Sequence, residues 1–166
     1  GKCPVRLEPC VKKIPGVRIA YLKLEKTNNV KYDFAMLWKQ LLKFSEDYKL
    51  SARGSKYVSL TLDYPFVTSE LQSRFMIGVT IPSSLDVPRG FGVYEIASGE
   101  YALFHFKGLY HELNRVYRHI YFDWLPSSVY ALREPFTFEV YLNTPKKTPV
   151  SELMTDIYIP VSLKEK

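Results

Sequence analysis

The stretch FTFEVYLNTP, residues 136–145, decides the fold, because a stretch of the same kind, KYVSLTLDYP, lies 80 positions earlier at 56–65. Both stretches alternate apolar and polar residues, and both end in proline. Alternation with a period of two predicts a β-strand, and a proline at its end predicts a turn. We therefore predict two equivalent strands in two equivalent halves of the chain.

Two amphipathic helices are predicted from apolar residues that recur at intervals of three and four. The first carries Phe34, Leu37, Trp38, Leu41, Leu42 and Tyr48, and the second carries Leu113, Val116, Tyr117, Ile120, Tyr121 and Trp124. Proline disfavours helix in the residue before it, so Pro126 predicts that the second helix ends at Leu125. Each helix is therefore expected to bury one side against a sheet.

A strand-like segment precedes each predicted helix. These segments are VRIAYLKL at 17–24 and EYALFHF at 100–106. Each follows a turn signal, Pro15-Gly16 or Ser98-Gly99, with another extended segment before it. We therefore expect a β-hairpin in front of each helix.

The same order of elements thus occurs twice, and matching residues lie 80 positions apart. The matching pairs include Tyr21 and Tyr101, Leu37 and Tyr117, Phe44 and Trp124, and Pro65 and Pro145. We predict an α+β fold: a tandem duplication of a strand–helix–strand–strand unit, with antiparallel sheets, one long helix per half and pseudo-twofold symmetry. Residues 1–166 then form one domain of two repeats, about 5–82 and 91–161, with a turn-rich joint at 83–90.

The composition is that of an ordinary globular domain. Apolar residues make up 46% of the 166 residues and charged residues 24%, which argues against disorder. No apolar run approaches the roughly 18 to 20 residues that cross a bilayer, and no signal peptide is visible. We expect no membrane partner and a cytoplasmic location. Because the chain begins at Gly1 without Met, we expect a processed chain or a fragment of a longer protein.

Metal and cofactor chemistry find no support in the sequence. Cys3 and Cys10 form no CxxC motif, and the three histidines, His105, His111 and His119, form no HExxH motif or Cys/His cluster. We expect no metal and no cofactor. The formal net charge of +6 would suit nucleic acid. Its basic residues are scattered, however, so we expect this chain to bind DNA weakly and without sequence preference.

Glu139 is the residue on which the functional interpretation depends. Alternation places Phe136, Phe138, Val140 and Leu142 on one face of the strand, predicted to be the core against the helix, and Thr137, Glu139, Tyr141 and Asn143 on the other. The second face either meets solvent or lines a cleft. Alternation alone favours solvent, because a face of Thr, Glu, Tyr and Asn is typical of an exposed sheet.

The order GEYALFHFKG … Y … WLP … FEVYLNTP … DIYIPV resembles the GyrI-like effector-binding domain. The resemblance is strongest over 99–161 and extends over 5–82 through the duplicated pattern. Members of this family are the ligand-sensing domains of AraC-type and multidrug-responsive transcription regulators, and some are free-standing proteins, including a gyrase inhibitor. The resemblance implies a duplicated fold with a cleft between the halves. That cleft binds bulky lipophilic, often cationic molecules around a central glutamate, whose motif position here is Glu139.

The resemblance favours the cleft over solvent for Glu139, and it suggests the aromatic residues that would surround a ligand. The expected ligand-binding residues are Glu139, Trp124, Tyr110, Tyr57, Tyr158 and Trp38. Trp124 and Trp38 lie on the apolar stripes of the helices, so their positions favour the core. Tyr110 lies at the start of the second predicted helix, and Tyr57 and Tyr158 lie on strands beside the proposed cleft. For each of them, a structural role and a place at the ligand remain equally open.

Three functions remain open from the sequence. The favoured one is a sensor of bulky lipophilic or aromatic ligands, cations among them. The second is a hydrolase of strained electrophilic natural products, in which Glu139 acts as general base. The third is an interaction protein like the gyrase inhibitor. No helix-turn-helix is visible, so DNA would be a partner only through a helix-turn-helix segment absent from this chain.

Overall fold

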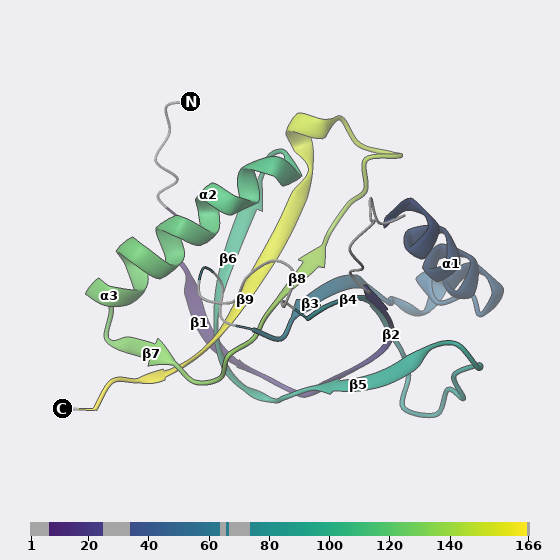
Figure 1. Cartoon of the computed structure of the whole chain (residues 1–166), viewed down its shortest axis with the longest axis horizontal. Helices are drawn as coiled ribbons and strands as arrows, with labels where there is room; N and C mark the ends of the chain where they lie inside the picture. The colour runs from purple at the N-terminus through teal and green to yellow at the C-terminus, as the bar shows by residue number, and fades with distance from the viewer. Residues whose placement is uncertain (1–6, 25–33, 64–65, 67–73, 166) are drawn as a thin grey trace.

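The computed structural model describes residues 7–24, 34–63, 66 and 74–165, which form a curved antiparallel sheet with helices on one face (Figure 1). The first half contains β1 (Cys10–Ile14), β2 (Val17–Leu24), α1 (Phe34–Asp47), β3 (Tyr57–Thr61) and β4 (Phe75–Thr80). The second half contains β5 (Gly92–Ile96), β6 (Gly99–Lys107), α2 (Leu113–Arg118), α3 (Leu125–Ser127), β7 (Tyr130–Leu132), β8 (Thr137–Tyr141) and β9 (Met154–Leu163). Pro65, which the repeat pairs with Pro145, lies outside the described residues.

The second helix passes the point at which the sequence predicts its end. A π-helical segment, η3 (His119–Trp124), joins α2 to α3, and the helix continues to Ser127. Leu125 keeps helical dihedral angles, φ −61° and ψ −47°, although a proline follows it. Pro126 stands in the last turn of this continuous helix, so the helix continues for only one residue beyond it. The prediction of an end at Leu125 is therefore wrong by two residues.

The predicted hairpins are also wrong, because β1 and β5 exchange partners. β1 pairs with β6, and β5 pairs with β2, both antiparallel. The two ladders share one register. Cys10 is paired with Leu103 and Ile14 with Gly99 in the first, and Val17 is paired with Ile96 in the second. The chain therefore bends at Pro15-Gly16 without reversing. Proline and glycine suit a bend as well as a tight turn, so the local signal does not distinguish the two.

The sheet follows the order β1-β6-β9-β8-β3-β4-β2-β5, and β7 pairs with β9 outside this path. The central strands are β8 and β3, which pair with each other in the register that places Glu139 opposite Ser59. α2 covers the β6 and β9 side of the sheet and α1 covers the β2 and β4 side (Figure 1). The two helices therefore flank the central strands on the same face.

Each helix packs over its own apolar cluster. Under α2 the buried residues are Ala102, Phe104, Phe106, Leu113, Val116, Ile120, Ile157, Ile159 and Val161. Under α1 they are Ala20, Leu22, Leu41, Phe44, Leu50, Ile77, Val79 and Ile81. Both clusters lie on the sheet face that carries Glu139, since Glu139 is paired with Ile157 on β9 and Ser59 with Ile77 on β4.

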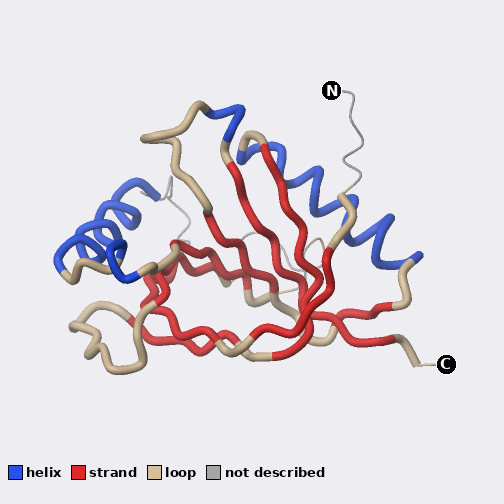
Figure 2. Tube along the Cα trace, turned by 180° about the vertical axis from the view of Figure 1, so that it is seen from behind, coloured by secondary structure: helices blue, strands red, loops and turns tan. Residues whose placement is uncertain are grey.

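A third apolar cluster lies on the opposite face of the sheet. Its buried residues are Ile19, Val58, Leu60, Met76, Ile96, Tyr101, Phe136 and Phe138. Figure 2 shows from behind how the strands of the sheet curl.

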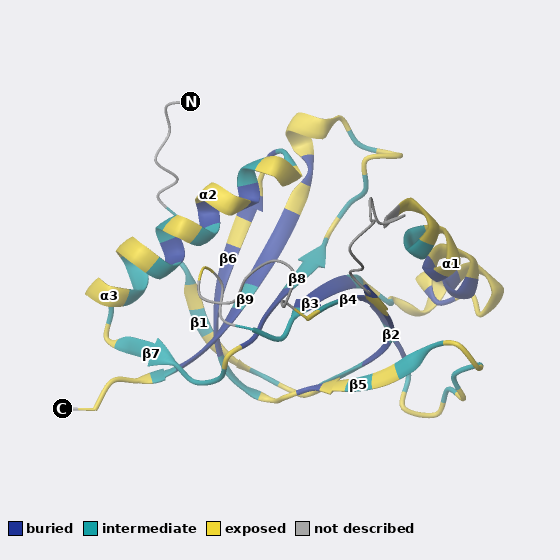
Figure 3. Cartoon of the chain, in the orientation of Figure 1, coloured by how far each residue is buried: buried dark blue, intermediate teal, exposed yellow. Residues whose placement is uncertain are grey.

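The prediction that the apolar face of the 136–145 stretch lies in a core is confirmed for Phe136 and Phe138, and Val140 packs at its edge, but Leu142 is exposed. The core meets other strands and not a helix, so the predicted contact with the helix is wrong. A strand alternates in the same way whichever layer covers it, so the sequence could not identify the layer. Figure 3 shows the buried segments of the strands beneath both helices.

None of the helices in the described part of the chain combines the length and the apolar composition that a membrane span requires.

Candidate functional site

Glu139 lies on β8, in the middle of the sheet face between α1 and α2. Its neighbours across the ladder are Ser59 on β3 and Ile157 on β9. The side chain is half-buried, and Ser59 is 3% exposed. A half-buried carboxylate on a packed face requires polar partners, because desolvation disfavours an isolated charge.

Hydroxyl groups from three elements supply those partners. Tyr117 on α2 donates to Oε2 of Glu139 with an Oη–Oε2 distance of 2.5 Å. Tyr141 on β8 lies with its Oη 2.9 Å from both Oε1 of Glu139 and Oγ of Ser59. Ser59 Oγ in turn lies 3.4 Å from Oε1. A phenol has one proton to donate, and a carboxylate is the stronger acceptor, so Tyr141 donates to Glu139.

The two tyrosines are held as neutral donors. Burial, then the charge of Glu139, raises the pKa of the Tyr117 hydroxyl well above its ordinary value. The pKa of the Tyr141 hydroxyl is also raised well above its ordinary value, mainly by burial and secondly by the charge of Glu139. Tyr110 follows the same pattern, with a pKa raised by burial and secondly by Glu139. Each phenol therefore keeps its proton at neutral pH and remains able to donate it to an acceptor.

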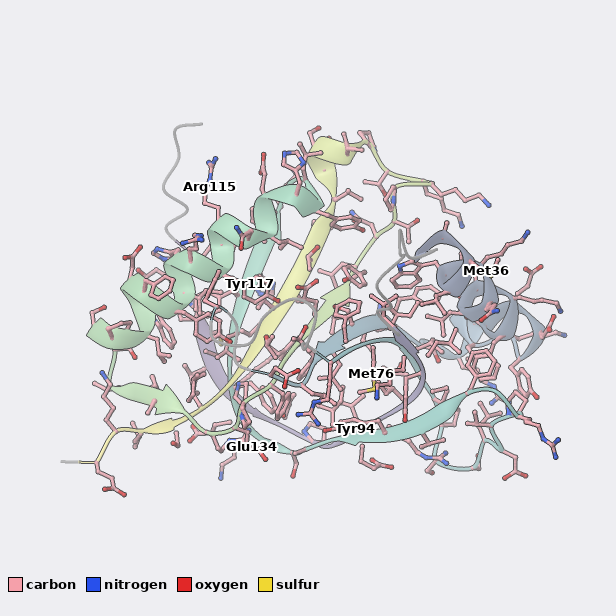
Figure 4. The ribbon with its side chains drawn as sticks, in the orientation of Figure 1. Met36, Met76, Tyr94, Arg115, Tyr117 and Glu134 are labelled. Atoms are coloured by element: carbon pink, nitrogen blue, oxygen red, sulfur yellow. The ribbon has the colours of Figure 1, made fainter. Side chains whose placement is uncertain are left out.

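Aromatic rings from both halves surround these groups. Trp38 on α1 makes edge contacts with Tyr141 and Tyr57, at ring-centroid distances of 5.9 and 6.1 Å. Tyr110 meets Tyr141 edge-on at 5.6 Å. We call the seven side chains Trp38, Tyr57, Ser59, Tyr110, Tyr117, Glu139 and Tyr141 the Glu139 cluster. Figure 4 shows Tyr117 pointing from α2 toward the strands, while Arg115 of the same helix points away from them.

The structure brings four of the six predicted ligand residues together and leaves two elsewhere. Glu139, Trp38, Tyr57 and Tyr110 belong to the Glu139 cluster. Trp124 packs against Phe104 and Tyr130, with centroid distances of 5.2 and 6.2 Å, at the edge of the apolar cluster under α2. Tyr158 stacks on Phe138 at 4.4 Å, on the opposite face of the sheet.

Three members of the cluster were not among the predicted site residues. Strand alternation did place Tyr141 on the face of Glu139, so its participation was available from the sequence. Tyr117 was assigned to the apolar stripe of the second helix, and a stripe position gives no sign that the hydroxyl reaches a carboxylate. Ser59 had one signal, its distance of 80 positions from Glu139, which matches the repeat.

Metal ligands are not gathered at this site. Nowhere in residues 7–24, 34–63, 66 and 74–165 do three His, Cys, Asp or Glu side chains come close enough together to hold a metal ion. The chemistry that the Glu139 cluster offers is one carboxylate, neutral hydroxyl donors and aromatic rings. Such a set suits a ligand with aromatic surface and a positive charge.

Comparison with protein families gives one match that spans nearly the whole chain. Residues 7–162 match the GyrI-like family, described as a GyrI-like small molecule binding domain. No curated protein matches the chain by sequence.

Solved structures share the fold at low sequence identity. The C-terminal domain of EcmrR superposes with a TM-score of 0.72 and 15% identity, over 96% of this chain and all of that domain. In an EcmrR–DNA complex the TM-score is 0.68 at 16% identity, over 95% of this chain but 58% of the EcmrR chain.

Two further solved structures differ in what they are reported to be. SAV2435 bound to tetraphenylphosphonium has a TM-score of 0.62 and 17% identity, over 93% of this chain and 94% of that one. A hydrolase from Listeria innocua has a TM-score of 0.65 and 11% identity, over 93% and 92%. At these identities the similarity concerns the fold.

Proposed function

The chain belongs to the GyrI-like small-molecule binding domain family, and we propose that it senses bulky lipophilic or aromatic ligands, cations among them, at the Glu139 cluster. The observation that carries this proposal is the position of Glu139. It is a half-buried carboxylate on the sheet face between α1 and α2, surrounded by rings from both halves. A delocalised cation there would gain both a counter-charge and cation–π contacts of roughly 0.5 to 2 kcal/mol per favourable ring.

The three hydroxyl donors add a condition on the ligand. They stabilise the carboxylate while no cation is present, so a ligand cation need not form a close ion pair with it. A small, strongly hydrated cation would lose much of its hydration and find the carboxylate oxygens already hydrogen-bonded. A large cation with spread charge loses little hydration, and therefore fits the cluster better. SAV2435, which shares the fold, has been solved bound to such a cation, tetraphenylphosphonium.

The proposed site lies at the seam of two proposed repeats. In the proposed repeat, β1, β2, β3 and β4 correspond to β5, β6, β8 and β9. Replacing each strand of the sheet by its counterpart gives the same order of strands, read from the other edge, which supports a duplication. In the β3–β8 ladder Ser59 stands opposite Glu139, its counterpart 80 positions away. Two equivalent residues of a duplicated sheet are paired with each other only where the twofold axis passes between them. The proposed axis therefore passes between Ser59 and Glu139.

The offset between the proposed repeats is not uniform. The burial pattern of β2 matches that of β6 when residues 82 positions apart are compared, so that Ala20 corresponds to Ala102. The register of β3 and β4 against β8 and β9 agrees with an offset of 80. Tyr21 and Tyr101 are therefore not counterparts in burial, although they are 80 positions apart.

We also propose that the domain serves a transcription regulator, of the AraC type or another multidrug-responsive type, in the cytoplasm. The support is the fold shared with EcmrR, which has been solved with DNA and whose chain is longer than the part matched here. DNA would then be a partner of a separate helix-turn-helix segment. A ligand that binds one relative position of the two halves more tightly would shift the domain toward that position.

A hydrolase is the second candidate, and one distance favours it. Tyr117 Oη lies 2.5 Å from Oε2 of Glu139, so a general base and a proton donor stand side by side. A hydrolase from Listeria innocua has the same fold. In that reaction Glu139 would activate water toward a strained electrophilic carbon, and Tyr117 would donate a proton to the leaving group. An epoxide or cyclopropane probe that is consumed by the wild type but not by Glu139→Gln would support this activity.

Calorimetry with matched ions, together with NMR spectra of the ¹⁵N-labelled chain, tests the sensor proposal. Tetraphenylphosphonium and tetraphenylborate have nearly the same shape and opposite charge, so their difference in affinity isolates the charge of the site. We expect the cation to bind more tightly than the anion, with amide resonances of β3 and β8 shifting as it binds. Equal affinities, or shifts confined to other strands, would contradict the proposal.

A further inference from the structure

The joint between the two halves forms a second cavity that the Glu139 cluster does not include. It has a volume of about 450 Å³, within the usual range for small-molecule sites. Its walls come from β2, from the second half of α1 and from the turn at 88–91. The lining residues are Leu22, Gln40, Lys43, Phe44, Asp47, Tyr48, Pro88, Arg89, Gly90 and Phe91. We call it the joint cavity.

The floor of the joint cavity is aromatic. Phe44 is 4% exposed and meets Phe91 at a centroid distance of 4.6 Å, with the rings tilted by 30°. Tyr48 lies 4.9 Å from Phe44 and is partly open to solvent. A ligand ring placed here would contact Tyr48 and Phe91 and remove apolar surface from water.

The rim of the joint cavity carries an unbalanced positive charge. Lys43 Nζ donates to Asp47 Oδ2 at 2.9 Å, so these two charges offset each other. Arg89 is exposed at the tip of the turn, and no ion pair of its guanidinium is found within the part of the chain that the structure describes. A guanidinium binds a carboxylate through two parallel hydrogen bonds, which a phenol or an amine cannot match.

The turn that carries Arg89 is held in place. Phe91 N–H donates to Pro88 O at 3.4 Å, and Gly90 adopts φ +99°, as the third position of a type II turn requires. Arg18 Nη1 donates to the carbonyls of Pro82 and Ser83, each at 3.1 Å, and of Leu85 at 3.3 Å. Arg18 thereby fixes the beginning of the joint to β2, and the turn itself fixes residues 88–91. A fixed wall lowers the entropic cost of binding.

From these contacts we infer that the joint cavity is a second small-molecule site, selective for compact aromatic carboxylates. The ring lies on Phe91 and Tyr48, and the carboxylate pairs with Arg89. Its charge preference is opposite to that of the Glu139 cluster. α1 connects the two sites, because Trp38 belongs to the Glu139 cluster while Gln40, Lys43 and Asp47 of the same helix line the joint cavity.

The test uses 2-naphthoate and its neutral analogue 2-naphthylmethanol, titrated into the ¹⁵N-labelled chain. We expect 2-naphthoate to bind with a dissociation constant of about 1 mM or below, a range that a ligand of this size reaches when it binds efficiently. Amide shifts should appear at 43–48 and 88–91. The neutral analogue should bind at least about threefold more weakly, because it lacks the ion pair.

Two variants and a control assign the site. Arg89→Gln should weaken 2-naphthoate about fivefold, and Arg53→Gln, an equal charge change at an exposed residue outside the cavity, should leave it unchanged. Gln40→Trp fills the cavity from the solvent side of α1 and should abolish binding. Failure of 2-naphthoate to bind, equal losses in both arginine variants, or full affinity in Gln40→Trp would each overturn the inference.

The joint cavity and the Glu139 cluster are tested separately. Glu139→Gln should leave the affinity for 2-naphthoate unchanged, and Arg89→Gln should leave that for tetraphenylphosphonium unchanged. If 2-naphthoate shifted only the resonances of β3 and β8, it would be a ligand of the Glu139 cluster and the joint cavity would not be a site.

Discussion

At the scale of single residues, Glu139 is tolerated on a packed face because hydroxyl donors replace the water it loses. Charge-assisted hydrogen bonds to a carboxylate are roughly twice as strong as neutral ones. Tyr117 contributes one such bond and Tyr141 another. The burial that raises the pKa of both phenols also keeps them in the protonated form that donates. The carboxylate and the phenols therefore stabilise one another.

Removing the hydroxyl of Tyr117 tests this mutual stabilisation. Tyr117→Phe keeps the ring and leaves Oε2 of Glu139 without its short hydrogen bond, so we expect the free energy of unfolding to fall by about 1 to 3 kcal/mol. Tyr48→Phe, at an exposed ring, is the control and should change it by less than about 0.5 kcal/mol. Urea denaturation measures both, and equal effects in the two variants would show that the Tyr117 bond contributes nothing.

The raised phenol pKa values also predict how stability depends on pH. In the unfolded chain a phenol titrates near pH 10, whereas folded Tyr117 keeps its proton to higher pH. The unfolded state therefore binds fewer protons above pH 10, and the free energy of unfolding falls as pH rises. One such group contributes a slope of up to about 1.4 kcal/mol per pH unit. Tyr117→Phe should accordingly lose stability less steeply between about pH 9 and pH 11, and parallel slopes would refute this prediction.

Strand alternation places Glu139 and Tyr141 on one face, and the family resemblance adds Trp38, Tyr57 and Tyr110, but neither predicts Tyr117 or Ser59. Alternation along one strand is local, so it assigns Glu139 and Tyr141 to one face without any knowledge of the fold. Tyr117 and Ser59 reach the carboxylate from α2 and β3, which requires the packing of three elements. Tyr158 was predicted at the site but lies outside it. Its strand was predicted correctly, but its pairing with Phe138, which places the ring on the opposite face of the sheet, was not.

At the scale of elements, helices and strands follow from the sequence better than their pairings do. α1 covers the segment that the apolar periodicity predicts from Phe34 on, and it ends one residue before Tyr48. The exchange of β1 and β5 is not local. The same alternating residues could pair with the next strand or with the distant strand, 71 to 93 residues away, that they meet in the structure. The sequence also does not predict that His119–Trp124 is π-helical, because the apolar pattern of this segment is equally typical of an α-helix.

A disulfide can report the exchange of strands directly. Cys10 stands opposite Leu103 in the β1–β6 ladder, and directly paired residues have Cα atoms about 4.5 to 5.5 Å apart, a distance that a disulfide spans. In a Cys3→Ser background, we expect Leu103→Cys to cross-link to Cys10 on mild oxidation. Ala102→Cys, one residue away and on the opposite face, should not. Mass spectrometry of proteolytic fragments identifies the bond, and its absence in the Leu103→Cys variant would contradict the pairing.

At the scale of the whole molecule, two helices stand on one face of a continuous sheet and leave its two central strands to the Glu139 cluster. The order of elements and the 80-residue repeat predict two similar halves. They do not predict that the halves share one sheet, which depends on the contact between β3 and β8. The Glu139 cluster forms at that contact, and this is why residues of both halves meet in it.

The charge of the whole molecule bears on DNA binding. The net charge of +6 is dispersed, so we expect this chain to bind duplex DNA weakly and without sequence preference. Fluorescence anisotropy with two unrelated duplexes should give equal affinities that fall steeply between about 50 and 200 mM salt. Sequence-specific binding that persists at physiological salt would mean that the described fold itself recognises DNA.

The central claim is that Glu139 selects ligands by their charge, and calorimetry of Glu139→Gln tests it most directly. The substitution keeps the shape of the side chain and removes its charge. We expect the affinity for tetraphenylphosphonium to fall by about 1 to 3 kcal/mol, while that for neutral triphenylphosphine oxide stays within about 0.5 kcal/mol of the wild type. Glu46→Gln, an equal charge change on the exposed side of α1, should alter neither affinity. An equal loss for both ligands, or no loss for the cation, would contradict the claim.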